Sequence, residues 1–192
     1  MQIQDALRDA PSFLRNAQDT AQRTPANPDL LYMWDNQVTA IESFLANTED
    51  LGKEHPDLAT TRKTLLDLKK AIQTKVLEFE LKQEGQELPP EPTEEELVED
   101  LSEFGKDIQE LCKEVAKAPV KTVKDLEELE EPRQQINAFL VDTEALVGKS
   151  PALDKIRTLA KETRKKLEDR AQEVIREWRQ QDLAGGDDDD DG

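Results

Sequence analysis

Few residues in this chain have side chains that could carry out catalysis or bind a metal. The single histidine, His55, lies beside Pro56 in a predicted break between two helices, with no other histidine in the chain to share a metal. A role in the break itself is the simpler interpretation. The single cysteine, Cys112, follows Ile108 and Leu111 on an apolar helix face, where a buried structural thiol is expected.

The carboxylates at the end of the sequence form no recognisable metal motif. Asp187–Asp191 lack the alternating ligands and the turn glycine of an EF-hand loop, so a solvated tail is expected. The sequence also contains no glycine-rich phosphate loop and no nucleophile elbow. We therefore expect a protein that is not an enzyme and uses no cofactor and no metal.

The charge of the chain restricts its partners. The 192 residues include 44 acidic and 26 basic side chains, which gives a formal net charge of −18. This charge disfavours nucleic acids and anionic membranes, both of which require a basic surface. It favours a basic partner protein, or it serves solubility alone.

Three features predict a cytoplasmic location, with a nuclear one as the alternative. A lone cysteine suits a reducing compartment. No apolar run reaches the roughly 18 residues of a membrane span, so no membrane insertion is expected. Residues 1–5 lack the basic start and apolar centre of a signal peptide.

The sequence resembles itself when it is shifted by 95 residues. Residues 41–62 and 136–157 share nine identities in 22 positions without a gap. The identical residues of the first copy are Ile41, Phe44, Leu45, Thr48, Glu49, Leu51, Pro56, Leu58 and Arg62. Downstream of both segments, apolar residues recur at helical steps of three and four in the same register. These observations indicate an internal duplication.

Breaker residues divide each copy into three predicted helices. In the first copy we expect helices at about 2–22, 28–51 and 56–82, with Asn27 and Pro28 starting the second and Gly52 ending it. In the second copy we expect them at about 93–116, 123–147 and 151–181. Pro132 either begins or bends the helix at 123–147. Trp34 is expected in the core, whereas Trp178 either staples a helix or forms an exposed contact.

The predicted fold class is all-α, with two tandem three-helix bundles related by the 95-residue repeat. Residues 1–84 form the first bundle, and the Pro/Glu-rich segment 85–92 is the linker. Residues 93–182 form the second bundle, followed by a disordered acidic tail at 183–192.

Charge is segregated between the helices of each copy. No basic residue occurs between Arg23 and Lys53, so the helix at 28–51 carries only acids, whereas the helices at 56–82 and 151–181 are rich in lysine and arginine. Arg62, Lys69 and Gln73 are expected on one semi-exposed flank beside the apolar stripe. This pattern indicates either complementary neighbouring helices or a polarised docking surface.

The third helix of each copy resembles that of the BAG domain, the three-helix module of heat-shock-70 co-chaperones, which often has the pattern V-R-x-A-R-R-x-x-V-R-K-V-Q. Residues 61–73, T-R-K-T-L-L-D-L-K-K-A-I-Q, match it in Arg62, Lys70, Ile72 and Gln73. Residues 156–168 match it at the positions of Arg157, Lys165 and Leu167, and Lys161 keeps one basic residue. The departures are Leu65-Leu66 at the double arginine and Glu168 at the glutamine.

The resemblance implies nucleotide-exchange assistance to a heat-shock-70 chaperone, through contacts with its nucleotide-binding domain. The acidic contact would be Glu49 or Asp50 in the first copy and Asp142 or Glu144 in the second. The candidate protein-binding residues are Glu49, Asp50, Arg62, Lys69, Lys70, Gln73, Asp142, Glu144, Arg157, Lys161, Arg164 and Lys165. The alternatives are an acidic chaperone for basic clients such as histones, and a helical-repeat scaffold or adaptor.

Overall fold

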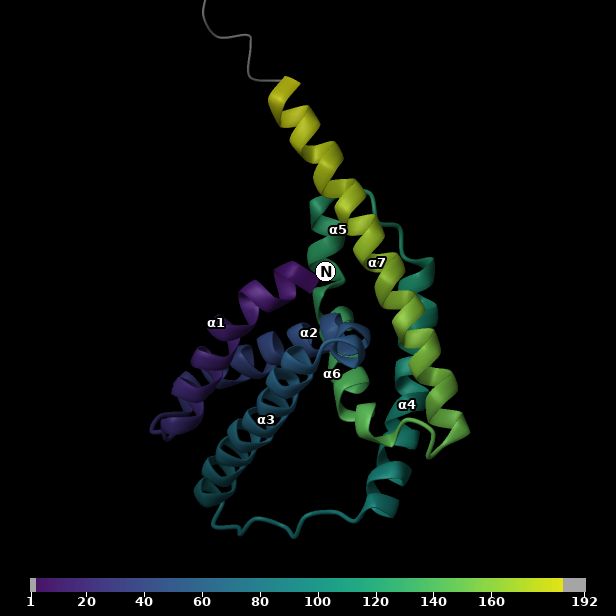
Figure 1. Ribbon diagram of the computed structural model, residues 1–192. Helices are drawn as coiled ribbons and strands as arrows, with labels where there is room; N and C mark the ends of the chain where they lie inside the picture. The colour runs from purple at the N-terminus through teal and green to yellow at the C-terminus, as the bar shows by residue number, and fades with distance from the viewer. Residues whose placement is uncertain (1–2, 185–192) are drawn as a thin grey trace, which may run out of the picture. The chain divides into compact units, whose positions relative to one another are not determined.

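Every regular element of the protein is helical in the part of the chain that the structure describes. The computed structural model describes residues 3–184, with side chains through residue 180, and contains seven α-helices, two 3-10 helices and no strand in that range (Figure 1). The all-α prediction is therefore confirmed. Residues 1–2 and 185–192, including the predicted acidic tail at Asp187–Asp191, lie outside the described residues.

The chain divides into two compact units, Met1–Thr93 and Glu94–Gly192. Unit 1 contains α1 (Ile3–Gln22), η1 (Pro28–Leu30), α2 (Leu31–Glu54) and α3 (Pro56–Gln83), and each α-helix packs against the other two. Its core includes the predicted tryptophan together with aliphatic residues of α2 and α3. The largest buried members are Trp34, Ile41, Phe44, Leu45, Leu58, Leu65 and Ile72.

Local sequence explains where the helices of unit 1 begin and end. The Asn27 side chain accepts a hydrogen bond from the Asp29 backbone N–H at 2.9 Å, so the predicted cap exists but it starts η1. Gly52 does not end α2, which continues to Glu54. His55 then takes an extended conformation between α2 and α3, and its side chain caps neither helix. Gly85, with φ of +70°, ends α3 in a left-handed conformation that glycine tolerates best.

Unit 2 contains α4 (Glu94–Lys117), α5 (Val123–Glu128), α6 (Glu130–Asp142), η2 (Glu144–Leu146) and α7 (Pro151–Ala184). The long helices α4, α6 and α7 pack against one another, and the short α5 packs against α6 and α7. Its core has two clusters that share no buried residue. The first contains Ile108, Cys112, Ile136, Phe139, Leu140, Leu146, Leu153 and Ala160, and the second contains Val115, Val120, Leu167 and Val174.

The prediction of one helix at 123–147 is wrong. A capping box between Thr122 and Asp125 starts α5, which ends at Glu128, and α6 begins two residues before Pro132. A proline in the first helical turn costs no intrahelical bond, because the N–H groups there have no helical partner. The predicted helix at 151–181 begins at Pro151 as expected but reaches Ala184, beyond the predicted start of the tail at residue 183.

Candidate functional site

Two arginines among the predicted binding residues lie inside the helical units. Arg62 is 4% exposed, and its Nη1 donates to the carbonyl oxygen of Leu45 and, at 2.5 Å, to Thr48 Oγ1. Thr48 Oγ1 in turn donates to the Phe44 carbonyl at 2.8 Å. The arginine therefore ties α3 to the last turns of α2, and the oxygen dipoles of these acceptors stabilise its charge.

Unit 2 contains the same set of bonds. Arg157, also 4% exposed, donates from Nη1 to the Leu140 carbonyl at 2.6 Å and to Thr143 Oγ1. Thr143 Oγ1 donates to the Phe139 carbonyl at 2.6 Å. We call each arrangement an arginine clamp: Arg62 with Leu45 and Thr48, and Arg157 with Leu140 and Thr143. All three members of each clamp are separated from their counterparts by 95 residues.

A glycine in α2 makes room for the first clamp. A Cβ atom at Gly52 would lie 2.5 Å from Cδ and 2.9 Å from Nε of Arg62. Real Cβ atoms do not approach other atoms this closely, so any larger residue would push the arginine stem away. The absence of a side chain at Gly52 thus leaves space for the buried side chain of Arg62. Gly52 does not end a helix.

The expectation that Arg62 and Lys69 lie on a semi-exposed flank is wrong. Lys69 is 4% exposed, and its Nζ lies 3.0 Å from Oε1 of the equally buried Glu42. A buried ammonium group requires a partner of opposite charge. Glu42 is that partner, and the ion pair joins α3 to α2. Glu49 is buried as well, with Oε1 at 3.9 Å from Lys53 Nζ. Glu49, Arg62, Lys69 and Arg157 are therefore inaccessible to a partner in this conformation.

The other predicted binding residues keep some exposure. Half-buried side chains are Glu144, Lys161 and Arg164, and Arg164 lies 4.0 Å from Glu168. Lys70 pairs with Glu91 at 2.9 Å, on the segment that was predicted as a linker. The exposed residues are Asp50, Lys70, Gln73, Asp142 and Lys165. No single surface collects all of the predicted contacts.

Gln73 lines a groove between α2 and α3 in unit 1. The groove has a volume of about 250 Å³, and its apolar lining, which we call its floor, is the buried Val38, the half-buried Val76 and the exposed Leu77. Exposed acids from both helices, Asp35 and Glu80, stand at its rim. We call it the acidic groove, lined by Asp35, Val38, Thr39, Gln73, Val76, Leu77 and Glu80. It combines apolar surface with negative charge.

The exposed Tyr32 extends the same face of α2. Tyr32 precedes Asp35 by three residues and Thr39 by seven, which places all three on one side of the helix. Tyr32 as a whole is 59% exposed. An aromatic side chain with a polar tip is a common anchor at protein interfaces.

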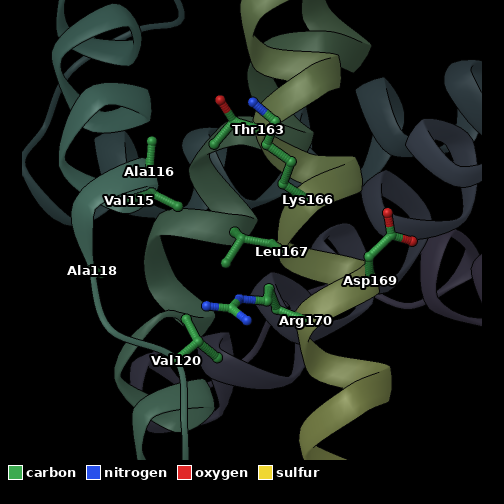
Figure 2. Close-up of a pocket in the computed structure, with 9 residues that line it drawn as sticks. All are labelled: Val115, Ala116, Ala118, Val120, Thr163, Lys166, Leu167, Asp169 and Arg170. Carbon is green, nitrogen blue, oxygen red and sulfur yellow. The ribbon is translucent and has the colours of Figure 1, made fainter.

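Unit 2 has a pocket of about 300 Å³ between the end of α4, the following loop and α7. We call it the basic pocket, lined by Val115, Ala116, Ala118, Val120, Thr163, Lys166, Leu167, Asp169 and Arg170. Figure 2 shows the Arg170 guanidinium beside Leu167 and Val120, whereas the Asp169 carboxylate points away from them. The pocket is therefore apolar inside and carries cationic groups at its edge.

The remaining reactive groups have structural surroundings. Cys112 is fully buried, and burial raises the pKa of its thiol despite a hydrogen bond with Thr163. Among the side chains that the structure describes, residues 3–180, no group of three or more His, Cys, Asp or Glu is placed to hold a metal ion. None of the described helices is both long and apolar enough to cross a membrane. Trp34 is buried, and Trp178 is 53% exposed near the end of α7.

Sequence reasoning missed the arginine clamps, the acidic groove and the basic pocket. A signal for the clamps was present, because Thr48 and Arg62 are two of the three polar residues among the nine identities, and they recur as Thr143 and Arg157. The floor of the acidic groove was assigned to the helix core, since Val38 and Val76 follow the apolar stripe. The basic pocket lies between the end of α4, the loop after it and α7, and no pattern within one predicted helix indicates how these segments pack.

No protein-family model, no curated protein and no solved structure matches this chain.

Proposed function

We propose that this chain is a non-catalytic binding protein that holds a basic, partly apolar segment of a partner protein in the acidic groove of unit 1. The observation that carries the proposal is the composition of the groove. Its floor offers Val38, Val76 and Leu77, while Asp35 and Glu80 at its rim attract cations. A segment that places one apolar side chain between lysines or arginines would satisfy both features.

The surroundings of the groove support a basic occupant. The whole stretch between Arg23 and Lys53 lacks a basic residue, so the α2 side of the groove has no positive charge of its own. On α3, Lys75 is directed to the end of α1, where it donates to the Arg23 carbonyl at 2.9 Å. Lys69 is held by Glu42. The net charge of −18 adds long-range attraction for basic clients, of which histones in the cytoplasm or nucleus are one kind.

The proposal includes a duplication of one three-helix bundle, followed by divergence of its surface. The matching arginine clamps support the duplication. The divergence is visible at the groove, because the positions 95 residues after Asp35 and Val38 are Glu130 and Arg133, which pair at 2.7 Å. A cation thus replaces an apolar floor residue, so we assign the basic client to unit 1 alone.

The test measures binding of labelled core histones to the full chain by fluorescence anisotropy, at about 50 mM and about 300 mM salt. The variant D35K/E80K reverses the charge at the rim of the groove. The matched control E99K/E103K makes the same change of charge on exposed acids of α4. We expect the rim variant to weaken binding by about tenfold, and the control by much less, because long-range attraction is largely screened beyond about 8 Å at physiological salt.

A third variant ends at Ala184 and so removes the terminal aspartates. The groove proposal predicts that this truncated protein retains binding. Loss of binding on truncation, equal weakening by the two charge variants, or absence of histone binding at low salt would each overturn it.

A second candidate function is docking on the nucleotide-binding domain of a heat-shock-70 chaperone through unit 2. It is favoured by the exposure of Asp142 and Lys165 and the partial exposure of Lys161, at positions where the BAG resemblance implies contacts. Burial weakens Arg62 and Lys69 as contacts in unit 1, and it weakens Arg157 in unit 2. Unit 2 keeps Arg164, the counterpart of Lys69, half-buried.

Release of labelled ADP from a heat-shock-70 nucleotide-binding domain tests this candidate. Docking predicts faster release with the wild-type chain, loss of the effect in K165E and retention in R176E, which changes an exposed arginine further along α7. Unchanged release together with no co-elution would exclude it.

A further inference from the structure

The basic pocket of unit 2 has the opposite charge character to the chain as a whole. Residues 115–124, which form one wall and the start of α5, contain Lys117, Lys121 and Lys124 and no acid. All three lysines are exposed. Lys166 and Arg170 add two more cations from α7. The pocket lining thus carries two cations and one acid, Asp169, and three further exposed lysines lie next to its wall in the sequence, in a protein whose net charge is −18.

The interior of the pocket suits a single bulky apolar side chain. Val115, Val120 and Leu167 are buried members of the second core cluster, and they form its inner surface. The small Ala116 and Ala118 leave the entrance open. A volume of about 300 Å³ is at the lower limit of small-molecule sites, and it is ample for one leucine or phenylalanine side chain.

Arg170 is available to an incoming carboxylate. Its Nη1 lies 3.6 Å from Glu173 Oε2, in an exposed pair three residues apart on the same helix. Such surface pairs contribute little and exchange readily with other partners. In Figure 2 the guanidinium lies beside the apolar lining, so one ligand segment could contact both.

The corresponding corner of unit 1 is occupied by the chain itself. The residue 95 positions before Arg170 is Lys75, whose Nζ donates to the carbonyl oxygens of Ala21 and Arg23 at the end of α1. In unit 2, Arg170 makes its ion pair within α7. Lys75 therefore bonds to the end of α1 in unit 1, whereas Arg170 borders a pocket in unit 2.

We propose that the basic pocket binds an acidic protein segment, with a bulky apolar side chain inserted between Val115, Val120 and Leu167 and flanking carboxylates on Lys166 and Arg170. Charge complementarity selects this occupant over a basic one. The apolar interior favours a peptide over a nucleic acid, whose phosphates would leave the hollow unfilled. The inference does not depend on the acidic groove, which lies in the other unit and takes a segment of opposite charge.

The experiment selects peptides on the full-length protein from a displayed library of random peptides, about twelve residues long. We expect one enriched class that combines Phe, Leu or Trp with several Asp or Glu. The variant A116W fills the entrance from an exposed position without removing a core side chain, and R170E reverses the edge. The matched control R176E makes the same charge change about 1.7 turns further along α7, at an exposed site outside the pocket.

Synthetic peptides of the acidic class should lose about tenfold or more in affinity to A116W and R170E, and less than about twofold to R176E. Circular dichroism of each variant verifies that it is folded. The proposal is overturned if no acidic class is enriched, if A116W and R170E bind it as the control does, or if phosphatidylserine vesicles and not peptides show the dependence on Ala116. Enrichment of basic peptides alone would support the acidic groove and contradict the basic pocket.

Discussion

Arg157 donates from Nη1 to the carbonyl oxygen of Leu140 across 2.6 Å, so a charged side chain of α7 satisfies a backbone group of α6. The Thr143 hydroxyl completes the clamp by accepting from the same nitrogen and donating to the Phe139 carbonyl. Arg62 makes equivalent bonds in unit 1. Each of these arginines holds a pair of helices together. Their removal should therefore lower the stability of the unit that contains them.

Replacement of Arg62 or Arg157 by leucine should destabilise the unit that contains it by about 2–3 kcal/mol, because buried oxygens lose a charged donor. Urea unfolding followed by circular dichroism measures the change. The control R176L removes an exposed arginine of α7 and should change the unfolding free energy by less than about 0.5 kcal/mol. Equal effects of the buried and exposed substitutions would contradict the clamps.

The Lys69–Glu42 ion pair predicts that substitutions of its two members have strongly non-additive effects on the free energy of unfolding. K69M leaves the buried Glu42 carboxylate without its cation and should cost about 3–5 kcal/mol. The double variant E42L/K69M removes both charges and should recover most of this loss, because apolar replacements of buried ion pairs are often neutral. A double-mutant cycle by urea unfolding gives the coupling energy. Additive effects would show that the two side chains do not interact.

The close approach of Gly52 to Arg62 predicts that G52A changes stability in a direction that depends on Arg62. Alanine usually stabilises a helix interior by about 1 kcal/mol relative to glycine. G52A should instead destabilise the wild-type chain, since its Cβ would lie 2.5 Å from Arg62 Cδ. In an R62L background, where the guanidinium no longer anchors the side chain, G52A should be neutral or stabilising. Thermal unfolding of the four proteins tests this, and the same sign in both backgrounds would contradict it.

The hydrogen bonds of Asp125 at the start of α5 predict a contribution to stability that is lost in acid. Its side chain accepts from the backbone N–H groups of Lys121, at 2.8 Å, and Thr122, at 2.9 Å, and these bonds lower its pKa below the usual aspartate value. The stabilisation is therefore present above the pKa of the unfolded chain and is lost as the pH falls through the lower, folded pKa.

D125N should consequently be less stable than the wild type at about pH 7, and the difference should disappear in acid once Asp125 is protonated. Carboxyl NMR titration gives the pKa directly, and thermal midpoints of both proteins across the pH range give the linkage. A midpoint of titration at or above that of an unstructured aspartate would contradict the capping interaction.

The sequence predicted the helical fold well because proline, glycine and capping residues mark most boundaries. Asn27, Pro56 and Pro151 all lie at helix starts in the structure. The start of a helix at Pro132 was one of the two alternatives for this segment. The break lies slightly earlier, at Leu129, because Pro132 sits inside the first turn of α6 and not between the helices.

The candidate binding residues were predicted less well, for a physical reason. Charge and helical spacing place Arg62 and Lys69 beside the apolar stripe, where long polar side chains normally reach solvent. Their burial depends on what faces them: Gly52 leaves space for the Arg62 stem, and Glu42 supplies a countercharge from α2. Such partners come from tertiary packing and cannot be recognised from one helix. Gln73 was the predicted residue that does line a concave surface.

The most direct test of the proposed function is an NMR titration of the isotopically labelled full chain with a basic peptide that carries one central leucine between lysines. The proposal predicts that the largest chemical-shift changes occur at the acidic groove, in particular at Val38, Gln73 and Leu77. They should be abolished in D35K/E80K and retained in E99K/E103K. Shifts spread evenly over the exposed acids of both units, or confined to the terminal aspartates, would contradict the proposal.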